Sequence, residues 1–195
     1  MKNENTKGNV WLPSLIIVVV LVIIAGFSCI HFNNSINAKY QDTKMQYSQI
    51  ETVLQRRNDL IPNLTSAVRG DMHNEQEIFD NIAKARSDFN SAKSAKEKFK
   101  ASNEVNESTN LLIKVIRENY PKLNSDKRVA DLMVELEGSE NRIATERQKY
   151  NQSVNDYNVT ITNFPGSLFA SGRSKLAYFE ADKGAEKIPK VDLDK

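Results

Sequence analysis

The chain has 195 residues, with 27 basic and 25 acidic side chains, a formal net charge of +2, two histidines and one cysteine. This balance, without a basic block, gives no electrostatic support for nucleic-acid binding. A single cysteine excludes an intrachain disulfide. A zinc site takes three or four nitrogen or sulfur ligands, and this chain can hardly assemble one, because it has only two histidines, His31 and His73, and its single thiol, Cys29, lies in an apolar segment. We therefore expect no metal, no cofactor and no nucleic acid.

The first segment along the chain is apolar enough to cross a membrane. Residues Leu12 to Ile30 read LPSLIIVVVLVIIAGFSCI and carry no charge. A helix of this length rises about 28 Å, close to the roughly 30 Å of a hydrocarbon core, and Trp11 stands at its edge, where aromatic rings favour the interface. A cleaved signal peptide fits less well, because the run exceeds a usual h-region and no A-x-A site follows. We predict a retained transmembrane helix.

Cys29, near the end of this segment, invites comparison with a lipoprotein signal. Ser28 is an acceptable small residue before a lipidated cysteine, whereas Gly26 and Phe27 depart from the usual pattern. Lipidation of Cys29 is therefore the weaker interpretation, and we favour a buried thiol in the membrane helix.

A heptad stripe follows the apolar segment. It advances in alternating steps of four and three residues, which keeps one helix face towards a partner. Pro62 lies within it and crowds the carbonyl of Asn58, so we expect a kink in one continuing helix. Gly70 should end this helix in a left-handed C-cap. The stripe consists of Ile36, Tyr40, Thr43, Tyr47, Ile50, Leu54, Arg57, Ile61, Leu64 and Val68.

A second amphipathic segment runs from about Glu75 to Asn119, and Asn74 and Glu77 have the spacing of an N-cap and its partner. One helix over this length would measure roughly 66 Å, against roughly 51 Å for residues 36–70, and would overshoot the first helix on running back. We therefore predict a non-helical interruption within 91–101. The apolar positions are Ile78, Ile82, Ala85, Phe89, Leu112, Val115 and Ile116.

Pro121 ends the second segment, and Ser125 is a suitable N-cap for a third. A second unbroken heptad stripe follows, until Pro165 and Gly166 end it. We interpret Leu176, Tyr178 and Phe179 as a lid on the end of the bundle. The charged tail, residues 182–195, is expected to be mostly disordered. The second stripe consists of Val129, Met133, Leu136, Glu140, Ile143, Arg147, Tyr150, Val154, Tyr157, Ile161 and Phe164.

Several of these stretches resemble the LemA family. The run QIETVLQRRNDLIPNLTSAVRG, from Gln49 to Gly70, is similar to that family's RR-x-DLIPNL stretch at the end of its first helix. The pattern continues in the family's order with ENYPKL at 118–123, ENRIATER at 140–147, Tyr-Asn at 150–151 and 157–158, and Phe164–Pro165. The resemblance extends from about Phe32 to about Val191. The polar region 91–105 and Phe27–Ser28 before Cys29 depart from it.

The resemblance implies an all-α fold, with an N-terminal single transmembrane helix followed by an antiparallel bundle of three to four long helices. We accordingly divide the chain into an N-terminal tail and transmembrane anchor (1–31), a LemA-like bundle (32–181) and the charged tail (182–195). The resemblance carries over no catalytic residues. Family members are often encoded near membrane metalloproteases, which suggests a partner of that kind.

Three charged residues occupy the two stripes: Arg57, Glu140 and Arg147. Charges at such positions fix helix register or partner choice, or else extend from the edge of the seam into water. In an up-down-up arrangement the two arginines lie at similar height and Glu140 about two turns lower. A carboxylate of the second segment, such as Asp88, would then be needed. We predict an inter-helix salt bridge from Arg57 or Arg147.

The remaining motifs favour structural interpretations. The cluster Arg56, Arg57, Asn58, Asp59 beside Pro62 could bind an anion, but we prefer a kinked helix whose freed polar groups its own side chains satisfy. An enzyme using Arg57, Asp59 and Glu140 is least favoured, because these residues lie on packing faces and not around a pocket. No G-x-S-x-G elbow or Gly-rich phosphate loop is present. Four sequons, interpreted as chance matches, begin at Asn63, Asn106, Asn151 and Asn158.

The sequence thus predicts a single-pass protein of the cell membrane without catalytic activity or a small-molecule substrate. It would act as an interaction or scaffolding module of the bacterial envelope, binding other envelope proteins or copies of itself. The alternative is an adaptor or regulator of a membrane metalloprotease. Lys2 and Lys7 precede the anchor, and the next basic residue of the Lys or Arg type is Lys39, so the positive-inside rule places the bundle outside the cytoplasm.

Overall fold

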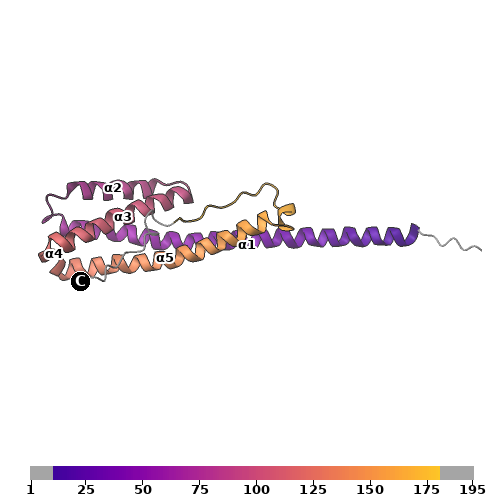
Figure 1. Ribbon diagram of the computed structural model, residues 1–195, viewed down its shortest axis with the longest axis horizontal. Coiled ribbons are helices and arrows are strands. Elements are labelled where there is room, and N and C mark those ends of the chain that lie inside the picture. The colour runs from indigo at the N-terminus through magenta and orange to yellow at the C-terminus, as the bar shows by residue number, and fades with distance from the viewer. Residues whose placement is uncertain (1–10, 181–195) are drawn as a thin grey trace, which may run out of the picture.

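One long helix, α1 (Trp11–Val68), forms the spine of the molecule (Figure 1). The computed structural model describes residues 11–180, so the charged tail lies outside the described residues. The 58 residues of α1 rise about 87 Å. The early part of α1 exposes large apolar side chains on all sides, whereas burial on one face begins near Ile36. The early part is therefore long and apolar enough to cross a membrane, and it does not serve as a core helix.

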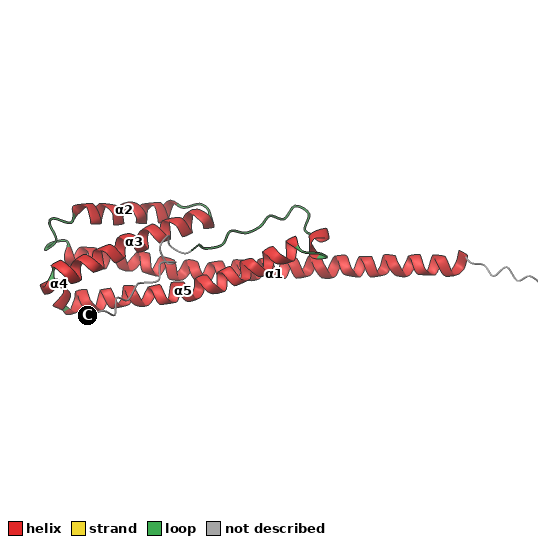
Figure 2. Cartoon of the chain, in the orientation of Figure 1, coloured by secondary structure: helices red, strands yellow, loops and turns green. Residues whose placement is uncertain are grey.

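The other regular elements are helices as well, with no strand between residues 11 and 180 (Figure 2). After α1 come α2 (Gln76–Ser91), α3 (Ala95–Asn119), the short α4 (Pro121–Ser125), α5 (Lys127–Thr162) and a 3₁₀ turn, η1 (Gly166–Phe169). The predicted all-α fold is confirmed. So is the predicted interruption, because α2 and α3 are separated by residues 92–94.

The interruption at 92–94 reverses the chain, and it corrects the expected topology. α2 and α3 form a hairpin beside α1, so that α5 runs antiparallel to α1 and the up-down-up arrangement is wrong (Figure 1). A capping box starts α3: Glu97 N–H donates to Ser94 Oγ at 3.2 Å, and Glu97 Oε2 accepts from the N–H groups of Lys93 and Ser94 at 2.9 and 3.2 Å. These backbone hydrogen bonds, that of Lys93 first, lower the pKa of Glu97. The Ser-x-x-Glu pattern at 94–97 signals such a helix start.

Two helix starts differ from the predicted ones. Ser125 lies at the end of α4, where its hydroxyl donates to the carbonyl of Pro121, and Asp126 caps α5 instead by accepting from Val129 N–H at 3.0 Å. Asp126 is the cap because its carboxylate reaches the N–H of Val129, an amide in the first turn of α5 that has no partner within the helix. α2 begins after Glu75, which makes no side-chain cap bond, so Asn74 is not its cap.

Gly70 also differs from expectation. Among residues 11–180 the one glycine with positive φ is Gly172, at +75°, so Gly70 does not adopt the left-handed conformation. α1 ends at Val68, and the next turns are closed by Asp71 and Met72 N–H groups, which donate to the Val68 carbonyl at 3.1 and 3.2 Å. The carbonyls at this helix end are thus satisfied without a left-handed residue.

The α1–α5 seam has a constant antiparallel register. In four facing pairs the two residue numbers add up to 196 or 197. α5 therefore covers α1 from about residue 35 to about residue 70, and the apolar first part of α1 extends beyond the end of α5 (Figure 1). The pairs are Tyr40 with Tyr157 (ring centroids 5.6 Å), Thr43 with Ser153 (Oγ1 to O, 3.2 Å), Tyr47 with Tyr150 (6.1 Å) and Arg57 with Glu140 (Nη1 to Oε1, 2.7 Å).

Candidate functional site

The polar segment before Pro62 sends its side chains to different places. Arg56 pairs with Glu135 of α5 at 3.1 Å, with both side chains largely exposed. Asp59 is also exposed and accepts from Gln55 on its own helix at 2.8 Å. Arg57 and Asn58, in contrast, are buried. The four residues do not converge on one pocket, so the structure gives no shared anion site at this segment.

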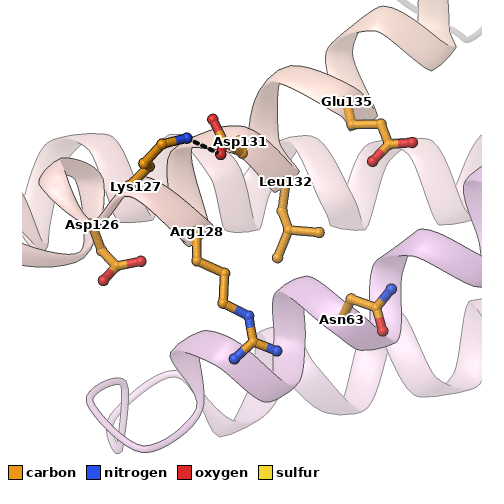
Figure 3. Close-up of a pocket in the computed structure, with 7 residues that line it drawn as sticks. All are labelled: Asn63, Asp126, Lys127, Arg128, Asp131, Leu132 and Glu135. Atoms are coloured by element: carbon orange, nitrogen blue, oxygen red, sulfur yellow. Dashed lines mark hydrogen bonds and ion pairs between the residues drawn. The ribbon is translucent and has the colours of Figure 1, made fainter.

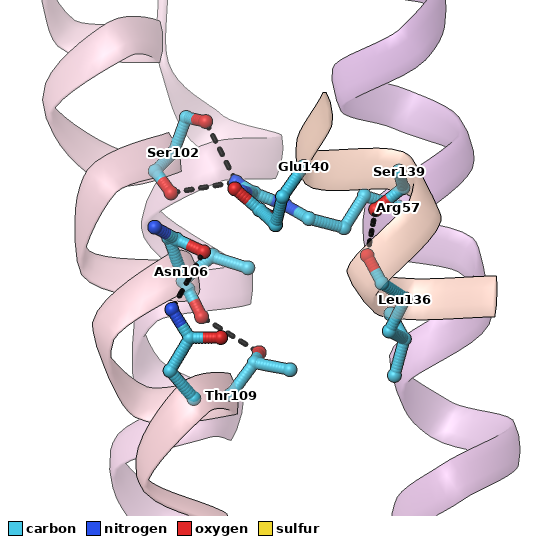
Figure 4. A network of polar contacts seen from close by, with 9 residues as sticks. Arg57, Ser102, Asn106, Thr109, Leu136, Ser139 and Glu140 are labelled. Carbon is cyan, nitrogen blue, oxygen red and sulfur yellow. Dashed lines mark hydrogen bonds and ion pairs between the residues drawn. The ribbon is translucent and has the colours of Figure 1, made fainter. Parts of the chain in front are cut away.

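Arg57 lies at the centre of a buried polar junction between three helices (Figure 4). Its Nη1 donates to Glu140 Oε1 of α5 at 2.7 Å, and its Nη2 donates to the carbonyl and hydroxyl of Ser102 of α3 at 2.6 and 2.7 Å. The Arg57 side chain is 3% exposed and that of Glu140 is 30% exposed. Arg57 Nε is the one buried side-chain nitrogen or oxygen within residues 11–180 that has no hydrogen-bond partner.

The partner of Arg57 differs from the one that up-down-up packing required. Asp88 is exposed on α2, and Glu140 lies level with Arg57 because α5 runs antiparallel to α1. Arg147, the third seam charge, is half-buried, and its guanidinium carbon lies 5.4 Å from the centre of the Phe179 ring. One seam charge thus joins α1 to α3 and α5, and another covers an aromatic side chain of the C-terminal segment.

Pro62 frees a carbonyl, and another helix satisfies it. Proline at 62 cannot donate to the carbonyl of Asn58, yet α1 continues to Val68. Arg86 of α2 donates through Nε to Asn58 O and to Asn58 Oδ1, both at 3.2 Å. Asn58 Nδ2 in turn donates to Asn90 Oδ1 at 3.1 Å. The expectation that α1 satisfies the freed group with its own side chains is therefore wrong, since α2 supplies the donor.

Replacing Arg86 with methionine is expected to destabilise the bundle by about 1–3 kcal/mol, because the Asn58 carbonyl then stays buried without a donor. In a Pro62→Ala background the new N–H at 62 can bond that carbonyl, so the same change should cost clearly less. Urea unfolding of a chain truncated to residues 31–195 measures both costs. Equal costs in the two backgrounds would show that Arg86 does not act through the carbonyl that Pro62 frees.

The C-terminal segment 170–180, which we call the strap, turns at residues 171–172 and then runs along α5 outside any helix or strand. Two asparagines of α5 hold its backbone, each through a pair of hydrogen bonds. Asn158 exchanges bonds of 2.9 Å with the N–H and carbonyl of Leu176, and Asn151 does the same with Phe179 at 2.8 and 2.9 Å. Asn151 and Asn158 follow the two seam tyrosines, which gives the repeated Tyr-Asn pair a structural role.

The spacing of these asparagines matches an extended chain. Seven helical residues separate Asn151 from Asn158 and rise about 10.5 Å, while three extended residues separate Leu176 from Phe179 and span about 10 Å. The sequence analysis did not predict this contact, because a segment that is held through its backbone shows no periodic pattern of apolar residues. The available signal was the Tyr-Asn repeat at heptad spacing.

The aromatic end of the strap is part of the core. Phe179 is buried and stacks on Phe99 of α3, with ring centroids 4.1 Å apart. Tyr150 Oη donates to the carbonyl of Ala177 at 2.9 Å. Burial of the phenol raises the pKa of Tyr150 to about 12, and electrostatic repulsion from Tyr47 adds to this shift. The phenol therefore keeps its proton at neutral pH. The predicted lid on the bundle end is corrected: the segment lies along the side of α5, where the asparagines hold it.

The hollows on the surface are open and charged. One of them, of about 790 Å³, lies between α1 and the start of α5 (Figure 3). Lys127 and Asp131, in the wall of this hollow, form an ion pair at 2.7 Å. The hydrogen bond between the two side chains raises the pKa of Lys127. Asp59 lines a different hollow of about 680 Å³ on α1. The residues that line the hollow of about 790 Å³ are Asn63, Asp126, Lys127, Arg128, Asp131, Leu132 and Glu135.

The other predicted positions are placed as follows. Arg57 and Glu140 meet in the buried junction, whereas Asp59 lies on the outer face of α1, so the three do not form one catalytic group. Residues 11–180 contain no group of three or more His, Cys, Asp or Glu side chains arranged to hold a metal. Cys29 is a free, exposed thiol within α1. Phe164 was placed on the α5 seam and is instead 80% exposed, because α5 ends at Thr162.

Comparisons with known proteins extend over the whole of this site. A model of the LemA family matches residues 46–193. The magnetosome proteins MamQ 1 and MamQ 2 of Paramagnetospirillum magneticum are each 25% identical over 195 aligned positions, covering 86% of this chain and 72% of the relative. Magnetosome protein MamQ of Magnetospirillum gryphiswaldense is 24% identical over 201 positions, covering 89% of this chain and 73% of the relative. The family match includes the three-helix junction, the Tyr-Asn repeat and the strap.

Proposed function

The chain belongs to the LemA family, and from this membership and its apolar N-terminal helix we propose that it is a single-pass membrane protein acting as a non-catalytic interaction or scaffolding module of the bacterial envelope. Its units are the anchor (1–31) and the bundle (32–181), with the bundle on the outer side of the membrane. Phe32 supports this division, since its ring stacks on that of Phe169 with centroids 5.3 Å apart, at the start of the proposed bundle.

The observation that carries this proposal is the continuity of α1. The helix passes without a break from the apolar segment into the bundle, so the membrane segment and the bundle share one rigid element. Such a stalk holds the bundle at a fixed height above the bilayer, and a scaffold requires that property more than an enzyme does. The buried Arg57 supports the same role, because its hydrogen bonds join α1 to α3 and α5.

Two exposed apolar side chains on different faces allow a test of where partners bind. Val134 of α5 is 65% exposed, and Leu111, on a different helix, α3, is 46% exposed. A photo-crosslinking amino acid at either position reports on one face only. The full-length protein, expressed in its native membrane, is irradiated, and its adducts are purified in detergent and identified by mass spectrometry.

We expect protein adducts at one of the two positions, abundant and reproducible, with the other position as the matched control. A self-adduct would assign the role to assembly of copies of this chain, and an adduct with a membrane metalloprotease would favour the adaptor alternative. The absence of protein adducts at both positions, together with turnover of a small molecule by the purified protein, would contradict the proposed role.

A further inference from the structure

The foot of the bundle, where α5 ends and η1 turns back, exposes apolar side chains beside the membrane segment. Phe164 is 80% exposed and Leu168 is 68% exposed, and both lie in the turn between α5 and the strap. Figure 1 shows this turn at the end of the bundle from which the apolar part of α1 projects. Large apolar side chains exposed together call for a partner surface.

Contacts to α1 fix the height of this turn relative to the apolar run. Phe169 stacks on Phe32, and Arg173 donates to Asn33 Oδ1 at 2.6 Å and to Asn37 Oδ1 at 2.9 Å. The apolar run ends at Ile30, so Phe32 lies about 3 Å beyond it, Asn33 about 5 Å and Asn37 about 10 Å along the helix axis, and Arg173 spans from the lower to the upper of these two asparagines. The headgroup layer of a bilayer is about 5–8 Å deep on each side of the hydrocarbon core. The turn is therefore level with that layer.

The charge of the foot suits an anionic lipid surface. Residues 31–41 of α1 and 157–179 of the C-terminal part, which meet at the Phe32–Phe169, Arg173–Asn33 and Tyr40–Tyr157 contacts, contain Lys39, Arg173, Lys175 and His31 but no Asp or Glu. Elsewhere the bundle mixes charges of both signs, as its near-neutral total requires. A group of positive side chains next to a membrane span attracts anionic headgroups, and this attraction falls off within about 10 Å.

We propose that the foot of the bundle is a second membrane contact, in which Phe164 and Leu168 enter the lipid interface while Arg173 and Lys175 face the phosphate groups of anionic phospholipids. The occupant of the exposed apolar surface is thus lipid, because the surface is continuous with the membrane span. This contact would fix the tilt of α1 and hold the bundle against the bilayer. The inference rests on the membrane span and is independent of which protein the bundle binds.

The geometry also explains one glycine of the turn. A Cβ added to Gly166 would lie 2.1 Å from the carbonyl oxygen of Thr160, which is closer than any side chain can approach. Only glycine lets the chain fold back this tightly after α5, so that Phe164 and Leu168 stay in one turn next to α1.

Tryptophan fluorescence in vesicles tests the proposal on the full-length chain. Trp11 is the single tryptophan, so a Trp11→Phe background accepts one reporter at a time: Phe164→Trp at the foot, or Val134→Trp as the control far along α5. The proteins are reconstituted in phosphatidylcholine–phosphatidylglycerol vesicles that carry lipids with spin labels at shallow or deep positions. We expect the reporter at 164 to be quenched severalfold more by shallow labels than the reporter at 134, and to be shielded from aqueous iodide. Lys175→Glu should reduce the quenching in anionic vesicles and leave it unchanged in pure phosphatidylcholine.

Two outcomes would overturn the proposal. Equal iodide access at 164 and 134 without lipid quenching would place the turn in water. Shielding from both iodide and lipid labels would show that protein covers it, and dilution of protein in lipid would then identify a second copy. Leu168→Trp serves as a second reporter, with the same expectations, if the change at 164 lowers the helical circular dichroism signal.

Discussion

Replacing Arg57 with alanine is expected to destabilise the bundle by about 3–5 kcal/mol, and Glu140→Ala by a similar amount. The first change removes the side chain that joins three helices and leaves Glu140 and the Ser102 carbonyl without their donor. The second change leaves a guanidinium that is 3% exposed without its counter-charge. Because the cost of Glu140→Ala comes from the buried guanidinium of Arg57 that it leaves unpaired, this change should lower the free energy of unfolding as much as Arg57→Ala does, although Glu140 itself is partly exposed. Urea unfolding of residues 31–195 measures both.

The neighbouring pair Arg56–Glu135 is the matched control. It joins the same two helices at a similar distance, but its side chains are 58% and 40% exposed. Arg56→Ala should therefore cost under about 1 kcal/mol. The double change Arg57→Leu with Glu140→Leu should recover most of the loss, since apolar side chains can replace a buried ion pair and Arg57 Nε lacks a partner already. If Arg57→Ala cost no more than Arg56→Ala, the buried junction would stabilise the bundle no more than an exposed ion pair does.

The heptad stripes allowed the seam positions to be predicted because each long helix buries one continuous face. Ile50, Leu54, Ile61 and Leu64 all lie in the core. The period carries no direction, however. Whether α5 runs parallel or antiparallel to α1 depends on whether residues 92–94 bend the second segment or reverse it, and the hydrophobic pattern is the same in both cases. The capping pattern at Ser94 and Glu97 marked a helix start, and only the structure shows that the chain turns back there.

The contacts of the candidate site were harder to predict than the core. The pairing of Arg57 follows from the antiparallel register, so the wrong topology led to the wrong partner, Asp88. Arg86 reaches the carbonyl that Pro62 frees from another helix, and no local pattern indicates such a distant donor. The strap is held by two asparagines through its backbone, so its side chains do not indicate those hydrogen bonds, although Phe179 does pack in the core. The Tyr-Asn repeat indicates these hydrogen bonds on the α5 side only.

Replacing Phe99 with alanine is expected to cost about 3–5 kcal/mol, the usual range for removing a buried aromatic ring. Phe99 is 4% exposed, stacks on Phe179, and packs within 5.2 Å of the Tyr150 ring. It lies on α3, so the cavity left by the change cannot be relieved without opening the bundle. Urea unfolding should therefore show a lower midpoint with an unchanged slope, which is the signature of a loss of stability in one cooperative unit.

Phe179→Ala removes the other ring of the same stack, yet it should behave differently. Phe179 belongs to the strap, which can leave α5 while the helices stay packed, so the loss of global stability cannot exceed the free energy that docks the strap. We expect a smaller midpoint shift than for Phe99→Ala, together with faster trypsin cleavage at Arg173 and Lys175, which lie in the strap. Tyr178→Ala, at a neighbouring position that is 44% exposed and makes only a long hydrogen bond of 3.4 Å to Asn155, is the control and should change both much less. If Phe179→Ala lowered the midpoint as far as Phe99→Ala without faster cleavage, the strap would unfold only together with the helices, and the asparagine contacts would belong to the same cooperative core.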